Sequence, residues 1–344
     1  LVEGGKALDI SGGGNPLLYQ HLFWFLAHPE VYVLILPAFA IISDVLPCNA
    51  RRPLWGHKMM IYAALTLAFL SFIVWAHHMY LTGMGTMMST FFQITTVLIS
   101  VPSVILLTCL MITLWGGSIR FNSQMLFATA FLPMFGIGGL TGLPLAFTFL
   151  DLFLHDTYYV IGHFHYVVAP GTIFALFAGV YHWYPKITGR YMSDFLGKLH
   201  FWPSLVCMNV IFGPMLYQGM IGFHRRWYDG GKYFEQVTDG HLWTNELISF
   251  GAWGLALAQV PFIINVFFSI KGGKKVTGDN PWGATTIEWA APNIPPHGNF
   301  TSEPVAYRGP YEYSVPGMER DFLPQFEAEA GAAAPQAAAA RAHH

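Results

Sequence analysis

Seven long apolar runs constrain the fold of this chain more than any other feature of its sequence. They cover residues 18–46, 59–81, 91–115, 124–148, 157–184, 201–221 and 244–270. A helix needs roughly 20 apolar residues to cross a bilayer. Because the bilayer core offers no water to unpaired backbone groups, runs of this kind form helices. The sequence therefore predicts an all-α polytopic membrane protein with a bundle of seven transmembrane helices.

The composition supports this class. Charged residues make up 10% of the chain and hydrophobic residues 54%, whereas soluble domains carry roughly 25% charged residues. Three cysteines, Cys48, Cys109 and Cys207, are far apart, so they form neither a disulfide framework nor a metal-binding pair motif. We therefore expect membrane lipid around the chain and no nucleic-acid partner.

The distribution of Lys and Arg predicts the orientation. Outside the C-terminal tail, ten of these residues fall on one side of the predicted spans and four on the other, and the richer side is normally cytoplasmic. Residues 1–15 are then an extracytoplasmic loop, 16–275 the transmembrane region, and 276–344 a cytoplasmic, extended and partly disordered tail. Since the chain begins with Leu1 and shows no signal peptide, we expect a fragment or a processed half of a longer protein.

The fifth run opens with the stretch HDTYYVIGHFHY, residues 155–166. Histidine inside a membrane span is costly and marks a functional site by default. His163 and His165 are two residues apart, so on a helix they project about 200° apart at nearly the same depth. One helix could therefore hold two cofactors, one on each face. Hydrogen-bonded core histidines are the alternative.

Polar residues near the outer surface form a second group. His155 and Asp156 lie eight and seven residues before His163, which on a continuous helix is roughly 12 Å nearer the surface. An imidazole and a carboxylate there suit a hard cation. The adjacent Arg225 and Arg226 run against the charge rule, and two neighbouring guanidinium groups suit carboxylates. Solvated loop charges are the alternative for this pair.

Three further histidines lie in the first two runs. His28, His77 and His78 offer three imidazoles without a thiolate, a donor set that favours copper over a structural zinc site. Tyr32 is four residues after His28 and shares its helix face, where a phenol can give an electron and a proton to a bound oxidant. Glu30 lies on another face in apolar surroundings, as a proton relay requires. A helix cap for the histidine pair and helix packing for the tyrosine are the alternatives.

Together these motifs resemble subunit I of the heme–copper oxidases, in the A-type cytochrome c oxidase branch. The matching stretches are residues 21–32 (HLFWFLAHPEVY), 75–78 (WAHH) and 155–166, with Arg225 and Arg226. The tail stretch NPWGATTIEW, residues 280–289, resembles the bacterial long forms. The likeness runs from about Gly12 to about Phe300. The family's subunit I has twelve spans and this chain matches the last seven, so another chain, or a part not included here, would supply the first five.

The resemblance implies the cofactors: two hemes, of A type, one copper and one magnesium. By this resemblance copper is bound by His28, His77 and His78, the high-spin heme by His163 and the low-spin heme by His165. Magnesium would be bound by His155 and Asp156 with help from subunit II. Arg225 and Arg226 would hold the heme propionates. Tyr32 would be the redox tyrosine, covalently linked to His28 in the family. Glu30 would end a proton pathway, and Trp24 would lie close to the copper.

The function that the resemblance implies is that of a terminal respiratory oxidase. Such an enzyme reduces oxygen to water at a heme–copper binuclear centre and translocates protons, here with electrons from cytochrome c. Its partners would be subunits II and III, and its location a bacterial cytoplasmic membrane with the C-terminus inside. A quinol oxidase of the same family, a non-enzymatic metal or proton conduit, and an assembly paralogue are the alternatives. Tyr32 argues against the related nitric oxide reductases.

The third run departs from the family at one position. The family has a lysine four residues after a proline, and here Leu106 follows Pro102 at that spacing. An aliphatic side chain can neither bind nor pass a proton. We therefore expect protons to reach the centre along hydroxyl groups, with Ser103, Thr108, Ser43 and Tyr32 as candidates, or by the Glu30 route.

Overall fold

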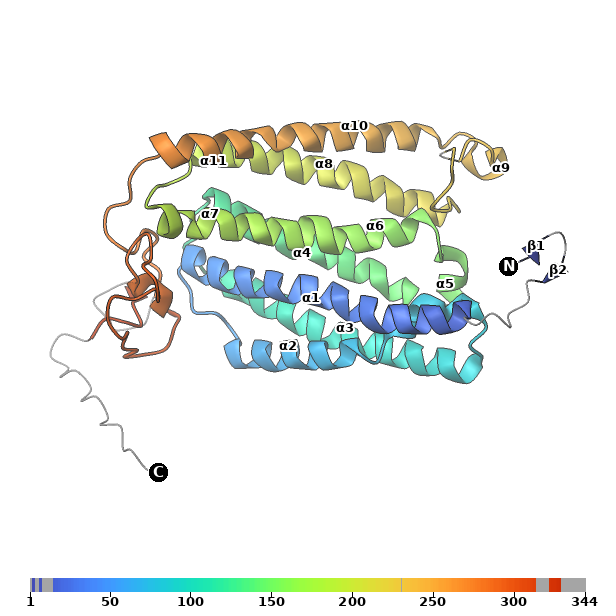
Figure 1. Cartoon of the computed structure of the whole chain (residues 1–344), viewed down its shortest axis with the longest axis horizontal. Helices are drawn as coiled ribbons and strands as arrows, with labels where there is room; N and C mark the ends of the chain where they lie inside the picture. Colours follow the sequence, from blue (N-terminus) through green and yellow to red (C-terminus); the bar gives the residue numbers. More distant parts are fainter. Residues whose placement is uncertain (1, 4–5, 8–14, 230, 314–321, 329–344) are drawn as a thin grey trace, which may run out of the picture.

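The computed structural model describes residues 2–3, 6–7, 15–229, 231–313 and 322–328. Its main feature is a bundle of long helices that run roughly alongside one another (Figure 1). In these residues, seven helical segments are long and apolar enough to cross a membrane: Pro16–Ala50, His57–Thr82, Thr86–Leu114, Ser123–Leu145, Tyr158–Thr188, Asp194–Met220 and Trp243–Gly272. The prediction of an all-α bundle with seven spans is confirmed.

The elements of the bundle follow one another in this order: α1 (Pro16–Ala50), α2 (His57–Ser71), η2 (Trp75–Thr82), α3 (Thr86–Leu114), α4 (Ser123–Leu145), α5 (Thr148–Leu154), α6 (Tyr158–Val167), η3 (Val168–Ile173), α7 (Phe174–Thr188), α8 (Asp194–Met220), α9 (Glu235–Thr238), α10 (Trp243–Ala258) and α11 (Val260–Gly272). The tail adds η4 (Ile287–Ala290). Two short antiparallel pairs join β1 (Val2–Glu3) to β2 (Lys6–Ala7) and β3 (Glu312–Tyr313) to β4 (Phe322–Leu323). We call the end of the bundle that carries residues 276–313 and 322–328 the tail end and the opposite end, with α5 and α9, the loop end (Figure 1).

Three of the predicted runs are not regular helices throughout. The second run leaves α2 at Ser71 and continues as the 3₁₀ helix η2, which carries the histidine pair. The fifth contains the π-helical segment η3 around Pro170, and the seventh divides into α10 and α11 at Gln259. Proline removes a backbone donor and disturbs the helical hydrogen-bond ladder around it. Hydropathy alone does not register these breaks.

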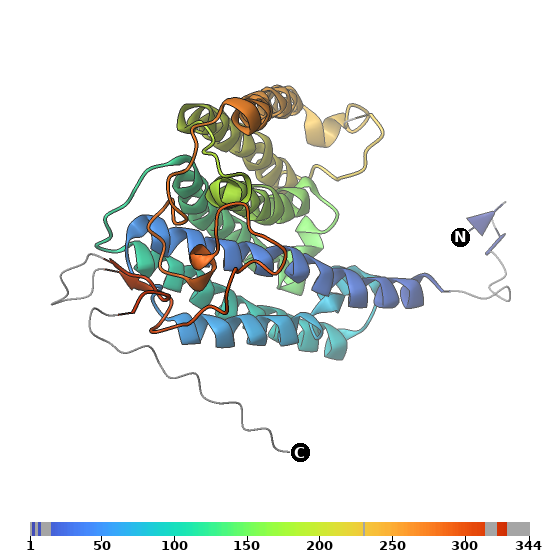
Figure 2. The ribbon, with the colours of Figure 1, turned by 60° about the vertical axis from the view of Figure 1, so that its left-hand side comes forward.

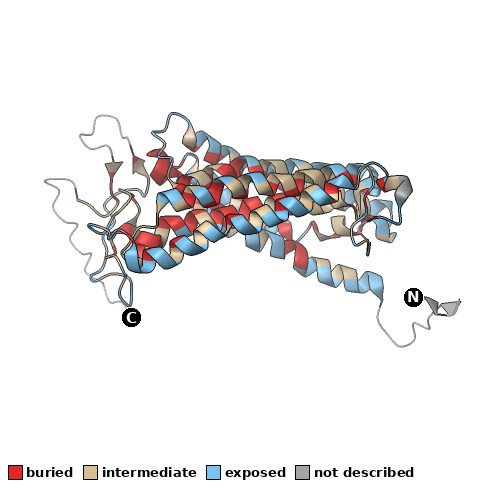
Figure 3. Cartoon of the chain, turned by 90° about the horizontal axis from the view of Figure 1, so that it is seen from above, coloured by how far each residue is buried: buried red, intermediate tan, exposed pale blue. Residues whose placement is uncertain are grey.

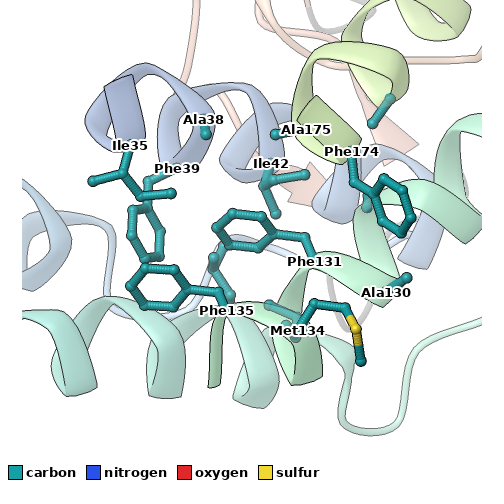
Figure 4. Packing of buried hydrophobic residues seen from close by; sticks show 14 of the residues in the cluster. Ile35, Ala38, Phe39, Ile42, Ala130, Phe131, Met134, Phe135, Phe174 and Ala175 are labelled. Atoms are coloured by element: carbon teal, nitrogen blue, oxygen red, sulfur yellow. The ribbon is translucent and has the colours of Figure 1, made fainter. Parts of the chain in front are cut away.

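Close side-chain packing holds α1, α4 and α7 together (Figure 4). The ring of Phe39 on α1 stands edge-on to Phe131 and Phe135 of α4, with centroids 5.2 and 4.9 Å away. Lipid tails are as apolar as these side chains, so helices in a bilayer associate through close fit and interhelical hydrogen bonds rather than through exclusion of water. This cluster fixes α1, the helix that carries His28 and Tyr32.

A glycine allows α6 and α8 to approach closely. A Cβ built on Gly219 of α8 would lie 1.9 Å from the backbone nitrogen of Tyr159 on α6. No side chain fits at that distance, so the crossing depends on the missing Cβ. Small residues at helix crossings are the usual means of close contact inside membranes.

The tail packs across the helix ends instead of extending away from them (Figure 2). Lys186 near the end of α7 donates hydrogen bonds to the carbonyls of Asp279 and Ala291, at 2.6 and 2.5 Å, and its ammonium lies 5.4 Å from the ring centre of Trp289. Trp289 itself is buried. A buried lysine thus organises this part of the tail against the helix ends, and the assignment of residues 276–344 as a cytoplasmic, partly disordered extension remains a prediction. The Ala-rich run from residue 330 lies outside the described residues.

The half of α1 nearest the loop end is largely uncovered. Figure 3 shows this part of the helix mostly in the colours of exposed and intermediate residues, and its exposed side chains include Leu22, Leu26 and Val33. In a bilayer such a face meets lipid or further helices.

Replacing Gly219 with alanine is expected to weaken the bundle. The added methyl group forces α6 and α8 apart, and overpacking of this kind costs about 1–3 kcal/mol or more. Gly139 of α4 is the matched control, because a Cβ there meets nothing within 4 Å. The midpoint of thermal unfolding, followed by circular dichroism in detergent, should fall for Gly219→Ala and should hold or rise for Gly139→Ala. Equal midpoints would contradict the role given to this crossing.

Candidate functional site

Three imidazoles converge between α1 and η2. One nitrogen each of His28, His77 and His78 lies within 4.8 Å of the others. The Nδ1 atom of His28 is 3.2 Å from Nε2 of His78, which is 3.1 Å from Nε2 of His77. Ligands placed 2.0–2.1 Å from a metal in a tetrahedron are roughly 3.3 Å apart. The spacing of these nitrogens is therefore close to that of a metal site.

The local fold explains how the three rings meet. His28 lies beside Pro29 in α1, while the tighter 3₁₀ turn of η2 lets the adjacent residues His77 and His78 present Nε2 atoms to one point. The other nitrogen of His77 pairs with the Thr96 hydroxyl at 3.0 Å. The indole of Trp24 stacks on His78 with 3.7 Å between ring centres and 9° between planes. These contacts hold the imidazoles in fixed orientations.

The donor set fits copper. Three neutral imidazoles without thiolate or carboxylate are ligands that suit this metal. His28 is buried, and its Nε2 atom has no hydrogen-bond partner. A buried polar atom without a partner is costly. The cost is consistent with a ring that is kept in this position to bind a metal. Such a centre could bind a small oxidant beside Tyr32.

Tyr32 and Glu30 occupy different faces of α1. The ring of Tyr32 lies against His28, with centroids 4.8 Å apart, as expected from their spacing of four residues. Glu30 is exposed on the surface of the described bundle. It lies in the part of α1 that crosses the bilayer, where a carboxylate cannot face lipid without a large cost. A further polypeptide segment would give this side chain suitable surroundings.

His163 points from α6 toward α4. Its Nδ1 atom donates to the carbonyl of Gly138 at 2.8 Å and lies 3.3 Å from the Thr141 hydroxyl. The Nε2 atom therefore keeps its lone pair. A Cβ on Gly142 would come within 2.7 Å of the His163 ring, so this glycine leaves the imidazole the space that it occupies. An imidazole oriented in this way is a suitable axial ligand for heme iron.

His165 points toward a different helix. Its Nδ1 atom donates to the carbonyl of Ile161 at 2.9 Å, and its ring stacks on Phe212 of α8 with centroids 4.8 Å apart. The two imidazoles thus lie on different faces of α6, and each keeps Nε2 for an axial bond. Their arrangement fits two heme groups side by side.

His155 and Asp156 lie in a turn and not on a continuous helix with His163. His155 follows the end of α5, and Asp156 has a left-handed backbone with φ of 56° before α6 begins at Tyr158. The turn is held because Asp156 accepts hydrogen bonds from the Arg225 side chain at 2.8 and 2.7 Å, and its carbonyl accepts the Arg225 backbone N–H. The sequence-based estimate of the distance between His155, Asp156 and His163 assumed one continuous helix, and that assumption is wrong.

Two possible metal-ligand atoms in this turn lie near one another. Nε2 of His155 is 3.8 Å from Oδ2 of Asp156, while Nδ1 of His155 pairs with the buried carboxylate of Asp151 at 3.1 Å. The hydrogen bond with Asp151 raises the pKa of His155, although burial opposes the shift. An imidazole and a carboxylate at this spacing could share a divalent cation.

The two arginines are placed differently. Arg225 is engaged with Asp156, while Arg226 is exposed and has a left-handed backbone with φ of 70°. The Arg225 guanidinium is therefore already paired with one carboxylate. The exposed Arg226 offers the second positive charge that the sequence predicts for carboxylate ligands.

The hydroxyl groups that we expected to conduct protons do not all lie where such a pathway would need them. Leu106 is buried in the apolar core. Ser103 and Ser43 donate to carbonyls of their own helices, Ile99 at 3.3 Å and Phe39 at 2.7 Å. Thr108 is exposed, so it does not lie between those groups.

Sequence reasoning missed two side chains that orient ligand candidates. Thr96 pairs with His77 across nineteen residues, and no spacing rule indicates that contact. Asp151 precedes His155 by four residues and pairs with it. That spacing is the signal that could have identified Asp151, provided that the short helix α5 had been recognised.

Comparisons with known proteins agree with one another. The family model described as "Cytochrome C and Quinol oxidase polypeptide I" matches residues 2–254. Cytochrome c oxidase subunit 1 of Synechocystis is 46% identical over 315 residues, covering 92% of this chain and 56% of that protein. The alternative cytochrome c oxidase subunit 1 of Bradyrhizobium diazoefficiens is 45% identical over 327 residues, covering 94% and 55%. The chain thus spans about half the length of these relatives.

A solved structure shows the same fold. The cryo-EM structure of a heme–copper terminal oxidase dimer superimposes with a TM-score of 0.66 at 25% identity, covering 76% of this chain and 50% of that one. The family model extends over both histidine groups. The family implies hemes and copper, oxidoreductase chemistry and an integral membrane location. The chain belongs to the cytochrome c and quinol oxidase polypeptide I family, the subunit I family of the heme–copper oxidases.

Proposed function

We propose that this chain forms the oxygen-reducing part of subunit I of a terminal oxidase. The enzyme would reduce oxygen to water, take its electrons from cytochrome c and translocate protons. The observation that carries the proposal is the convergence of His28, His77 and His78 beside Tyr32. Three imidazoles alone could serve a metal conduit. A phenol packed on one of them adds a source of a proton and an electron for a bound oxidant.

Each residue of the centre has a role that its position supports. His28, His77 and His78 would hold copper, and His163 would hold the high-spin heme. When bound, the copper and heme supply the electrons and the binding site for oxygen. Tyr32 holds a proton at its hydroxyl and can release it toward the centre. Trp24 keeps His78 in its plane by stacking on it, and Glu30 would bring further protons from the uncovered face of α1.

The second heme and the cation would complete the electron route. His165 would be one axial ligand of a low-spin heme, and Arg225 and Arg226 would neutralise heme propionates. His155 and Asp156 would bind magnesium together with subunit II. An A-type heme and cytochrome c as donor follow from the resemblance, and the names of the relatives support the donor.

Further chains would complete the structure. The exposed Glu30 and the apolar side chains around it on α1 would be covered by the five helices that the family adds before this region. Subunits II and III would be further partners. The charge distribution supports a tail end in the cytoplasm and a loop end on the outer side of a bacterial inner membrane.

The copper assignment predicts a selective loss. His77→Ala removes one of three ligands, so copper content should fall to near zero and oxygen consumption should stop, while the heme at His165 remains visible in the optical spectrum. Copper would be measured by elemental analysis and turnover with an oxygen electrode. Tyr32→Phe is the matched variant. It should keep copper and both hemes but lose turnover, since only the hydroxyl is removed. Normal turnover in either variant would overturn the assignment.

The heme assignments predict two different spectra. His163→Ala should remove the high-spin heme signal and spare the low-spin one, because the two imidazoles lie on separate faces of α6. His165→Ala should do the reverse. Reduced-minus-oxidised spectra and carbon monoxide binding distinguish the two signals. If each variant lost the other signal, the two assignments would be exchanged.

The cation assignment predicts a site that manganese can report. Manganese(II) can replace magnesium at oxygen-rich sites, and its electron paramagnetic resonance spectrum shows whether the ion is bound. Asp156→Ala removes a ligand and the partner of Arg225, so the bound signal should disappear. Asp229→Ala in the outer loop is a control and should retain it. A bound signal that survives in Asp156→Ala would place the cation elsewhere.

A further inference from the structure

Asp44 is a carboxylate inside a membrane-spanning helix. It lies six residues before the end of α1 at Ala50, roughly 9 Å from the tail end of that helix. Ionisable residues in such positions are costly and are functional by default. The roles proposed above do not use this side chain.

The tail supplies the partner of Asp44. The hydroxyl of Tyr311 donates to Oδ1 of Asp44 at 2.7 Å, across 267 residues of sequence. Tyr311 lies immediately before β3. It packs against the main core and against a second, smaller cluster that contains Cys48 and Trp289. Burial, together with the negative charge of Asp44, raises the pKa of the Tyr311 hydroxyl. At rest the phenol therefore carries its proton and donates it in the hydrogen bond to Asp44.

An imidazole connects this pair to the surface. His57 is exposed at the start of α2, and its ring stands edge-on to the Tyr311 ring with centroids 5.6 Å apart. Three titratable groups from α2, the tail and α1 thus lie next to one another, the imidazole exposed and the phenol and the carboxylate half-buried. Glu288 of η4 is a charged group that also acts on Asp44.

We propose that His57, Tyr311 and Asp44 form a proton-entry site at the tail end of the bundle. The proposal rests on the proposed function, because a reaction that consumes protons inside the membrane needs a supply from the cytoplasmic side. The tail is then a working part of the enzyme and not only a covering for the helix ends.

The transfer is balanced at each atom. The hydroxyl proton of Tyr311 moves along its hydrogen bond to Oδ1 of Asp44 and forms a carboxylic acid. In the same step the phenol oxygen takes a replacement proton from a surface water, and that water takes a proton from the imidazole of His57 in its protonated form. His57 is then recharged from the solvent. No bond other than O–H and N–H bonds forms or breaks, and no electron moves.

The position of Asp44 suits delivery to the metal centre. Asp44 and Tyr32 are twelve residues apart on α1, roughly 18 Å. Ser43 is the next residue toward Tyr32 on α1 and carries a hydroxyl group. Leu106 is apolar and buried, so it cannot carry a proton. Within the described part of α1–α3, Asp44 is the acidic side chain in the half of the bundle nearest the tail end.

Substituting asparagine for Asp44 separates transport from structure. The asparagine side-chain oxygen still accepts the Tyr311 hydrogen bond, so the tail should stay docked, but the amide cannot carry a proton. In the complete oxidase in vesicles, proton uptake from the tail side would be followed with a pH dye during anaerobic reduction. We expect uptake to slow about ten-fold or more, to lose its dependence on pH, and to recover in Asp44→Glu. Protection of the tail from protease should not change.

Three comparisons make the test decisive. Tyr311→Phe should slow uptake in the same way, and His57→Gln should slow it while leaving the protein folded, since His57 is exposed. Tyr233→Phe, an exposed phenol at the loop end, should have no effect. Wild-type uptake rates in Asp44→Asn with a docked tail would mean that the contact is structural only, and the proposal would be overturned. A wild-type complex with full metal content but no oxygen reduction would instead refute the proposed function.

Discussion

The structure depends on holding imidazoles inside a helical bundle that lipid surrounds. Polar groups in that setting must find partners, because no water is available to them. At the centre, nitrogens of three histidines stand 3.1 and 3.2 Å apart between α1 and η2. Mutual repulsion of charged imidazoles at such distances would be severe in a low dielectric, so the rings are neutral and ready to act as ligands. The packing of α1 against α4 and α7, the 3₁₀ turn of η2 and the hydroxyl of Thr96 all maintain this arrangement.

Hydropathy predicted the seven spans because their length and apolar content follow directly from the thickness of a bilayer. The motifs around His28, His77 and His163 were also readable, since helical spacing alone places Tyr32 beside His28 and separates His163 from His165. The breaks could not be predicted in the same way. A 3₁₀ segment at Trp75 and a π segment around Pro170 depend on which backbone hydrogen bonds neighbouring helices can replace. The turn at Asp156 is another example, because its geometry depends on Arg225, which lies 69 residues later in the chain.

The tail shows the limit of compositional reasoning most clearly. Residues 276–313 contain many prolines and glycines and few apolar runs, a composition typical of extended segments. Their order comes instead from a small number of long-range polar contacts. Lys186 binds two tail carbonyls, and the indole of Trp282 donates to the carbonyl of His182 at 2.7 Å. The Lys186 contacts give tail carbonyls a donor from α7, and the Trp282 contact gives a carbonyl of α7 a donor from the tail. The same ordering brings Tyr311 to Asp44.

The π segment η3 has a consequence for the spacing of the whole fifth span. A wider turn accommodates one residue more than an α-helical turn does, and each residue advances a helix by roughly 100°. The residues of α6 that face α4 and α8, His163 and His165 among them, are therefore out of phase with the residues of α7 that face α4 and α1. The number of residues between His165 and Lys186 thus determines which way His163 and His165 point. A chain one residue shorter here could keep both histidines and still turn the sides of α6 that carry them away from their neighbours, so the fifth span admits substitution more readily than insertion or deletion.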